Sequence, residues 1–269
     1  MAGIIIVLIL VIVGLSAPWI SPYDPNSQNL SHALRPPDWL FGPHMLGTDA
    51  VGRDILSRLF YGARISLVIA VLVVIISGVV GIALGAISGY FAGITDFLIQ
   101  KLVEVVWAFP PLLLAIAIMA FLGQGLENLI LALVSQRWIV YCRVSRGQAL
   151  SLRSREFIDA ARSLGAKHTR IIVRHIMPNL FPSALVIGTF SMASAIISEA
   201  ALSFLGLGDP TIPTWGQILE YGFRNSAVYL GYWWWILPPG LLVIFSAITF
   251  VFLAMGLEPV VNPRLRRWK

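Results

Sequence analysis

Residues 153–178 read RSREFIDAARSLGAKHTRIIVRHIMP and form the one long charge-rich segment between apolar stretches of this chain. The pattern predicts two short helices separated at a glycine. Ser154 would cap the first helix by accepting a backbone hydrogen bond, and Glu156 would place a negative charge in its first turn, where the helix dipole favours it. Gly165 suits the left-handed conformation that ends a helix, and Pro178 would end the second one.

Apolar residues of the first helix recur at helical spacing and are expected on one side: Phe157, Ala160, Ala161 and Leu164. The two alanines keep this side shallow, so another surface could approach it closely. We therefore interpret the side as a docking surface. The alternative on composition alone is a basic amphipathic helix that lies on lipid headgroups.

The overall composition excludes a soluble domain. Hydrophobic residues make up 58% of the chain and charged residues only 12%, and the mean hydropathy is +0.83. These values are typical of an integral membrane protein, which contacts lipid. The net charge of +6 is concentrated in particular loops, so we interpret it as a topology signal and expect no nucleic-acid partner. The single cysteine, Cys142, lies inside an apolar stretch and excludes an internal disulfide.

Apolar stretches long enough to cross a membrane as helices occur six times, since about 20 residues at ~1.5 Å each span a ~30 Å hydrocarbon core. The first resembles a signal-peptide core, but no Lys or Arg precedes it and Pro18 follows the small residue Ala17, so we expect an uncleaved span. The expected spans cover about residues 2–20, 65–87, 96–121, 126–150, 182–205 and 236–257.

These spans divide the chain into a first transmembrane helix (1–20), an extracytoplasmic loop (21–64), a five-helix membrane domain (65–258) that includes the loop 153–178, and a basic tail (259–269). Within the extracytoplasmic loop, Thr48 or Asp49 would cap an interfacial helix. Its apolar side would lie opposite Arg53 and Arg58 and consist of Ile55, Leu56, Leu59 and Phe60.

Particular residues inside the spans carry further expectations. Pro110 and Pro111 should kink the third span, because proline interrupts the helical hydrogen-bond ladder. Glu199 lies deep in the fifth span, where an ionised carboxylate facing lipid costs ~2.5 to 3.5 kcal/mol, so it should face the bundle or a water-filled path. It would either contact substrate in the translocation path or anchor the bundle through hydrogen bonds. Residues 233–235 are three consecutive tryptophans and predict an aromatic belt at the outer interface.

Basic residues set the expected orientation. Six Lys or Arg lie between residues 150 and 178 and four more in the tail, whereas residues 206–235 contain only Arg224. Loops rich in Lys and Arg stay in the cytoplasm. We therefore expect a multi-pass protein of the cell membrane whose N- and C-termini are both cytoplasmic.

The chemistry of ATP and metal binding is missing from the sequence. A P-loop needs glycine directly before its lysine, but Lys101, Lys167 and Lys269 follow glutamine, alanine and tryptophan. The four histidines show no metal-ligand spacing, and no nucleophile arrangement is present. We expect a non-catalytic chain that holds no cofactor or metal and draws its energy from another polypeptide.

The residues Asp159, Ala160 and Ala161, followed by Gly165 and Pro178 at fixed spacing, resemble the EAA loop of type I ABC importer permeases. The chain departs from the family pattern mildly, with aspartate at 159, histidine at 175 and methionine at 177. The resemblance implies a six-helix type I ABC importer fold with a cytoplasmic coupling helix. It also implies that Glu156 and the five residues named above couple the chain to an ATP-binding subunit.

Two further runs, residues 46–67 and 196–208, resemble the DppC/OppC-like permeases of the dipeptide, oligopeptide and nickel importer group. This implies an ATP-driven importer in which the chain pairs with a homologous permease, two ATPase subunits that bind ATP and Mg²⁺, and an extracytoplasmic substrate-binding protein. Peptides are the first expected substrate, and oligosaccharides or nickel chelates are the alternatives. An ion-coupled secondary transporter would need matching intramembrane carboxylates in two halves, and Glu199 has no such counterpart. A membrane enzyme would need a cluster of catalytic groups near one face, and none is apparent.

Overall fold

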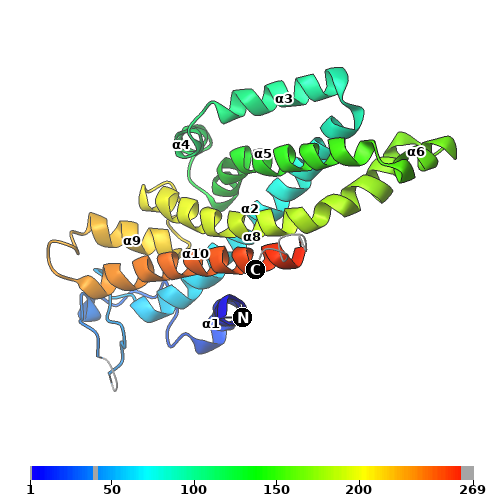
Figure 1. The fold of residues 1–269 in the computed structure, drawn as a ribbon. Helices are drawn as coiled ribbons and strands as arrows, with labels where there is room; N and C mark the ends of the chain where they lie inside the picture. The colour runs from blue at the N-terminus through cyan, green and yellow to red at the C-terminus, as the bar shows by residue number, and fades with distance from the viewer. Residues whose placement is uncertain (1, 39–41, 262–269) are drawn as a thin grey trace.

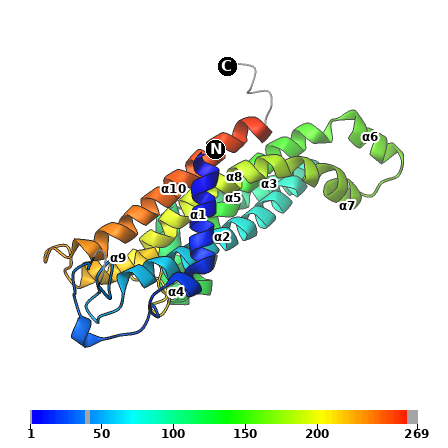
Figure 2. The same ribbon diagram turned by 90° about the horizontal axis from the view of Figure 1, so that it is seen from below.

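The computed structural model describes residues 2–38 and 42–261, which form helices joined by loops (Figure 1). Helices α5 (Leu126–Arg153) and α8 (Met177–Phe204) both pack against α2 (Ile55–Phe91). Helix α10 (Trp233–Val261) packs against α8, and α1 (Ala2–Ile20) crosses α2 and α10 (Figure 2). The shorter elements are α3 (Gly93–Trp107), α4 (Pro111–Leu122), α6 (Glu156–Ser163), α7 (His168–Ile171), α9 (Trp215–Arg224), the 3₁₀ turn Leu30–His32 and the π-helical turn Ile172–Ile176.

A row of glycines lets α2 and α5 touch backbone to backbone. A Cβ atom added at Gly85 would lie 2.4 Å from the carbonyl oxygen of Cys142 in α5. One turn to either side, a Cβ at Gly81 or Gly89 would lie 2.3 or 2.6 Å from another α5 carbonyl oxygen. In lipid, close packing of this kind replaces the hydrophobic effect as the force that holds helices together. The pair α2 and α5 therefore forms the centre of the bundle.

The described residues contain four or five helices that are long and apolar enough to cross a membrane, compared with the expected six. Among the described residues, α1, α2, α8 with its preceding turns, and α10 are long and apolar enough to cross a membrane. The bent pair α3 and α4 can form a fifth crossing. The expected fourth span corresponds to α5, whose 28 residues would extend ~42 Å, but its several arginines make it less apolar than the other spans. The expected tail begins inside α10, and its residues 262–269 lie outside the described part of the chain.

The expected kink in the third span is a sharp bend. Helices α3 and α4 meet at 86° across residues 108–110. Pro111 is the first residue of α4, where its missing N–H and fixed φ angle suit a helix start. Near the start of α3, Lys101 pairs with Glu104, with 2.7 Å between Nζ and Oε2.

The expected interfacial helix does lead into the second span, but both of its expected caps are wrong. Helix α2 begins at Ile55 and continues without a break through the second span. Its cap is Asp54, whose carboxylate accepts the N–H of Ser57, and neither Thr48 nor Asp49 caps it. Asp49 instead accepts the backbone N–H groups of the turn at residues 51–53. Arg58 is 3% exposed and donates to the carbonyl of Pro25, so it does not face solvent as expected.

The expected aromatic belt at residues 233–235 is also wrong for two of the three tryptophans. Trp234 and Trp235 are 7% and 0% exposed, and Trp233 is about half exposed. Helix α10 starts at Trp233, and successive residues of a helix point about 100° apart, so three in a row cannot all face the lipid headgroups. The Nε1–H of Trp234 donates to the carbonyl of Thr48 and ties α10 to the loop between α1 and α2.

Candidate functional site

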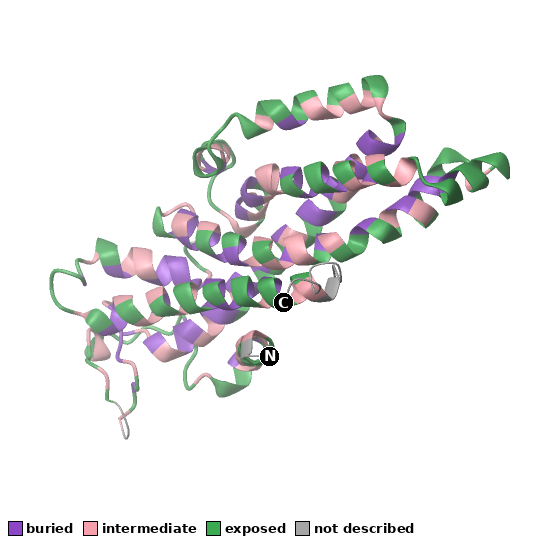
Figure 3. Cartoon of the chain, viewed as in Figure 1, coloured by how far each residue is buried: buried purple, intermediate pink, exposed green. Residues whose placement is uncertain are grey.

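The charge-rich segment lies at one end of the bundle, and the loop of residues 21–54 lies at the opposite end (Figure 1). Residues 154–176, here called the coupling elbow, contain α6, α7 and the π-helical turn. Most of α6 is exposed, whereas the turns that follow α7 carry buried residues (Figure 3). The elbow is therefore attached to the bundle on one side and open on the other.

Helix α6 ends as expected but begins differently. Arg155 is the residue before its first turn and offers no side-chain cap. The expected cap by Ser154 is wrong, because its hydroxyl donates to the carbonyl of Ser151 at the end of α5. Glu156 does lie in the first turn. Gly165 has φ +76°, and the N–H of Ala166 donates to the carbonyl of Ala161, which confirms the left-handed helix end.

The inner side of α6 rests on Ile158, which the sequence pattern did not single out. Ile158 is fully buried, and Ala161, one turn later, packs partly buried against the same cluster. The spacing of three between Ile158 and Ala161 was the available signal. The remaining buried members of this cluster are Ala86, Tyr90, Ala149, Ile171, Ile172, Ile176 and Leu180.

The outer side of α6 carries the other three residues of the expected docking surface. Phe157 is 45% exposed, Leu164 is 88% exposed, and Ala160 is exposed between them. A Cβ atom added at Gly165 would have no neighbouring atom within 4 Å, so the space beside this glycine is open. Asp159 also faces outward and pairs with Arg162, with 3.1 Å between Oδ1 and Nη1. Of the expected docking surface, Phe157, Ala160 and Leu164 are exposed together, while Ala161 belongs to the inner side.

Polar and aromatic contacts fix the elbow to the end of α2. The Tyr90 hydroxyl lies 2.7 Å from Nδ1 of His168. The guanidinium of Arg162 lies 5.5 Å from the centre of the Tyr90 ring, within the range of a cation–π contact. These contacts join the elbow to α2, which forms the bundle centre together with α5. The sequence pattern did not single out Tyr90 or His168, and no motif marks them.

The expectation that Pro178 ends a helix is wrong. Residues 168–204 form one continuous helical segment, in which Pro178 is the second residue of α8. A π-helical turn at Ile172–Ile176 directly precedes α8. Proline is tolerated in the first turn of a helix, and the wider π turn relieves the clash with the preceding carbonyl groups. Pro178 therefore marks the junction of the elbow with α8.

Glu199 lies inside the bundle, 1% exposed. Its carboxylate accepts hydrogen bonds from the hydroxyls of Ser66 in α2, at 3.0 Å, and Ser203 in α8, at 2.8 Å. These contacts join α2 to α8. The geometry favours the bundle anchor over the substrate contact, although the role itself stays a prediction.

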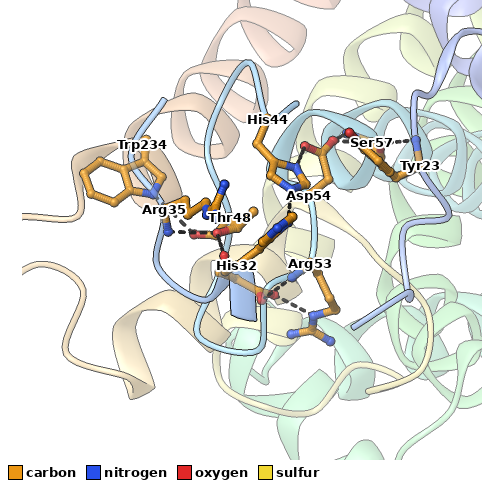
Figure 4. A network of polar contacts seen from close by, with 10 residues as sticks. Tyr23, His32, Arg35, His44, Thr48, Arg53, Asp54, Ser57 and Trp234 are labelled. Carbon is orange, nitrogen blue, oxygen red and sulfur yellow. Dashed lines mark hydrogen bonds and ion pairs between the residues drawn. The ribbon is translucent and has the colours of Figure 1, made fainter. Parts of the chain in front are cut away.

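A second polar cluster holds the loop between α1 and α2 together (Figure 4). Nδ1 of His44 lies 3.0 Å from Oδ1 of Asp54, and Nε2 of His44 lies 3.1 Å from Nδ1 of His32. With Nδ1–H of His44 donating to the carboxylate, its Nε2 accepts from His32. Thr48 is fully buried; its hydroxyl donates to the His32 carbonyl and accepts from the Arg35 N–H. No group of three or more His, Cys, Asp or Glu in the described residues could hold a metal ion.

The chain matches known transport proteins over its whole length. The family described as "Binding-protein-dependent transport system inner membrane component" matches residues 81–267, and "N-terminal TM domain of oligopeptide transport permease C" matches residues 1–37. Among solved structures, the fold is similar to a chain of the MetNI methionine ABC transporter, with a TM-score of 0.59 and 17% identity over 75% of this chain and 94% of the other. That likeness concerns the fold alone.

Curated relatives are similar at higher identity. The di/tripeptide transport system permease protein DppC of Pseudomonas aeruginosa is 38% identical over 99% of this chain and 88% of its own length. The oligopeptide transport system permease protein OppC of Bacillus subtilis is 37% identical over 99% of this chain and 86% of its own. This chain is a membrane permease that belongs to the family of binding-protein-dependent transport system inner membrane components.

Proposed function

We propose that this chain is one transmembrane subunit of an ATP-driven importer of peptides, in which the coupling elbow is the docking site for an ATPase subunit. The names of the relatives, which are di/tripeptide and oligopeptide permeases, support peptides over oligosaccharides or nickel chelates. A homologous permease, two ATPase subunits and an extracytoplasmic substrate-binding protein complete the assembly. ATP and Mg²⁺ bind to the ATPases, and this chain is non-catalytic.

The observation that carries the proposal is the outer side of α6. Leu164 and Phe157 expose apolar surface on a short helix that is packed firmly on its other side by Ile158. Exposed apolar residues on a rigid support are typical of a protein interface. Glu156, Asp159, Ala160, Ala161, Gly165 and Pro178 shape this surface and its junction with α8. The six basic residues between 150 and 178 favour a cytoplasmic elbow and cytoplasmic termini, on the side where the ATPases are.

The substitution Leu164→Asp tests the docking role. A charge in the interface would have to be desolvated without a partner, so we expect the copurified ATPase and the ATPase activity stimulated by the binding protein to fall about tenfold or more. The permease should remain folded, because Leu164 is 88% exposed. Thermal unfolding in detergent checks this point.

The matched control is Leu30→Asp, the same change at a 74% exposed leucine in the extracytoplasmic loop. This variant should keep the ATPase. Full ATPase binding and activity in Leu164→Asp would contradict the docking role. Thermal shift of the cognate binding protein against peptides, oligosaccharides and nickel chelates separates the substrate alternatives.

A further inference from the structure

Arg137 lies in the middle of α5, half-buried against α8 and far along the helix from the coupling elbow. Its Nη2 donates to the carbonyl of Ser194, at 2.7 Å, and to the hydroxyl of Ser198, at 2.8 Å, both in α8. Its Nε is enclosed and has no hydrogen-bond partner among the described residues. No Asp or Glu of the described chain lies within 4.0 Å of this guanidinium. A charge inside a membrane protein without a counter-ion is costly and marks a functional position.

Arg137 borders two cavities. One of about 240 Å³ lies between α4, α5 and α8 and is lined by Trp107, Gln136 and Ser198, among others. The second, of about 270 Å³, lies between α5 and α8 and includes Phe190 and Ser191. Both are lined by Arg137 and Ser194. The guanidinium therefore stands where the two spaces meet.

Three serines of α8 border the same two spaces as Arg137. Ser191, Ser194 and Ser198 recur at spacings of three and four and border the cavities, so their hydroxyls form a stripe along one side of the helix. A stripe of hydroxyls beside a guanidinium without a counter-ion suits a solute that carries hydrogen-bonding groups and one negative charge. Arginine binds carboxylates through paired, charge-assisted hydrogen bonds.

We propose that Arg137 is the residue of the translocation path that binds a carboxylate, and that this carboxylate is the C-terminal group of the transported peptide. The inference rests on the proposed peptide import and names the part of the substrate that the membrane subunit recognises. A carboxylate side chain of the homologous permease would form the same hydrogen bonds with Arg137. The two spaces beside Arg137 favour the mobile substrate, because they leave room for a solute that is two or three residues long.

The test compares a peptide with its C-terminal amide in proteoliposomes that contain the full transporter and its binding protein. The two compounds are chosen so that the binding protein binds them equally by thermal shift. Wild type should import the free acid faster. Arg137→Gln should lower import of the free acid about tenfold, the value of one lost charge-assisted pair, and change import of the amide much less. Arg137→Lys should restore part of the free-acid import.

Lys101→Gln is the matched control, since it removes one positive charge from an exposed position of α3. It should leave the ratio of free-acid to amide import unchanged. Equal loss of both peptides in Arg137→Gln, or no loss, would overturn the proposal. Loss of the homologous permease from the purified complex would assign the carboxylate to that subunit and also overturn it. If wild type imports neither peptide, the proposed function itself fails.

Discussion

The loop between α1 and α2 and the coupling elbow, at opposite ends of the same bundle, are built in contrasting ways. The loop has almost no regular structure, yet His44, Thr48, Asp49 and Asp54 are all at most 5% exposed and hydrogen-bonded within the chain. The elbow is helical, yet Leu164 is 88% exposed. The presence of regular helices therefore does not indicate which region makes all of its side-chain contacts within the chain.

The two regions differ in whether their side chains find partners within the chain. In the loop, buried polar groups must find partners inside the chain, because an unpaired buried group costs about 1 to 3 kcal/mol. In the elbow, one side of α6 rests on the cluster around Ile158, and the apolar groups of the other side are open to solvent. The second arrangement leaves the apolar groups of Phe157 and Leu164 available for another subunit.

The largest expected effect on stability comes from Asp54→Ala. The substitution removes the cap of α2 and orphans the buried Nδ1–H of His44. Together these losses should destabilise the permease by about 2 to 4 kcal/mol. Thermal unfolding in detergent should show a clear drop in Tm, and an unchanged Tm would mean that the loop does not depend on this network.

The same substitution in the elbow, Asp159→Ala, should have a much smaller effect. Asp159 is exposed and pairs only with Arg162, a contact of the kind that contributes at most ~0.5 kcal/mol. The Tm of Asp159→Ala should match that of wild type. Any loss of function should appear as lower ATPase activity in the presence of the binding protein. A drop in Tm as large as that of Asp54→Ala would remove the contrast between the two regions.

The smallest expected effect is a pH dependence confined to the loop. Burial lowers the pKa of His32 from its ordinary 6.5, and the neighbouring Arg35 and His44 act in the same direction. The unfolded state then binds more protons than the folded state, so the contribution of His32 is present above pH 6.5 and is lost as the pH falls below it. Lowering the pH from about 7.5 to about 5.5 should therefore reduce Tm less in His32→Gln than in wild type. An equal reduction in both would contradict this assignment.

Much of the fold could be predicted because lipid imposes long apolar helices. The spans, the glycine contact of α2 and the left-handed Gly165 all follow from local residue properties. The failures concern choices that depend on distant groups. Asp54 rather than Asp49 caps α2 because Asp49 is occupied by its own turn, and the continuation through Pro178 depends on a π turn with no marker in the sequence.

The candidate site was predicted in outline and corrected in detail. The sequence located the elbow, but its helical pattern could not tell that Ile158 and Ala161 face the bundle while Phe157 and Leu164 face away. Which side of α6 faces the bundle depends on the residues of α2, α5 and α8 that pack around Ile158. The contact between Tyr90 and His168 joins residues 78 positions apart, a pairing that no local pattern could indicate.

The contrast between the two regions is tested most directly by amide hydrogen exchange of the purified permease pair, measured with and without the ATPase subunits. Amides of residues 156–165 should exchange at least about tenfold more slowly when the ATPases are bound, because docking would close the open side of α6. Amides of residues 44–57 should be slow in both samples. Exchange in the elbow that is the same with and without the ATPases would contradict the claim that it is the docking site.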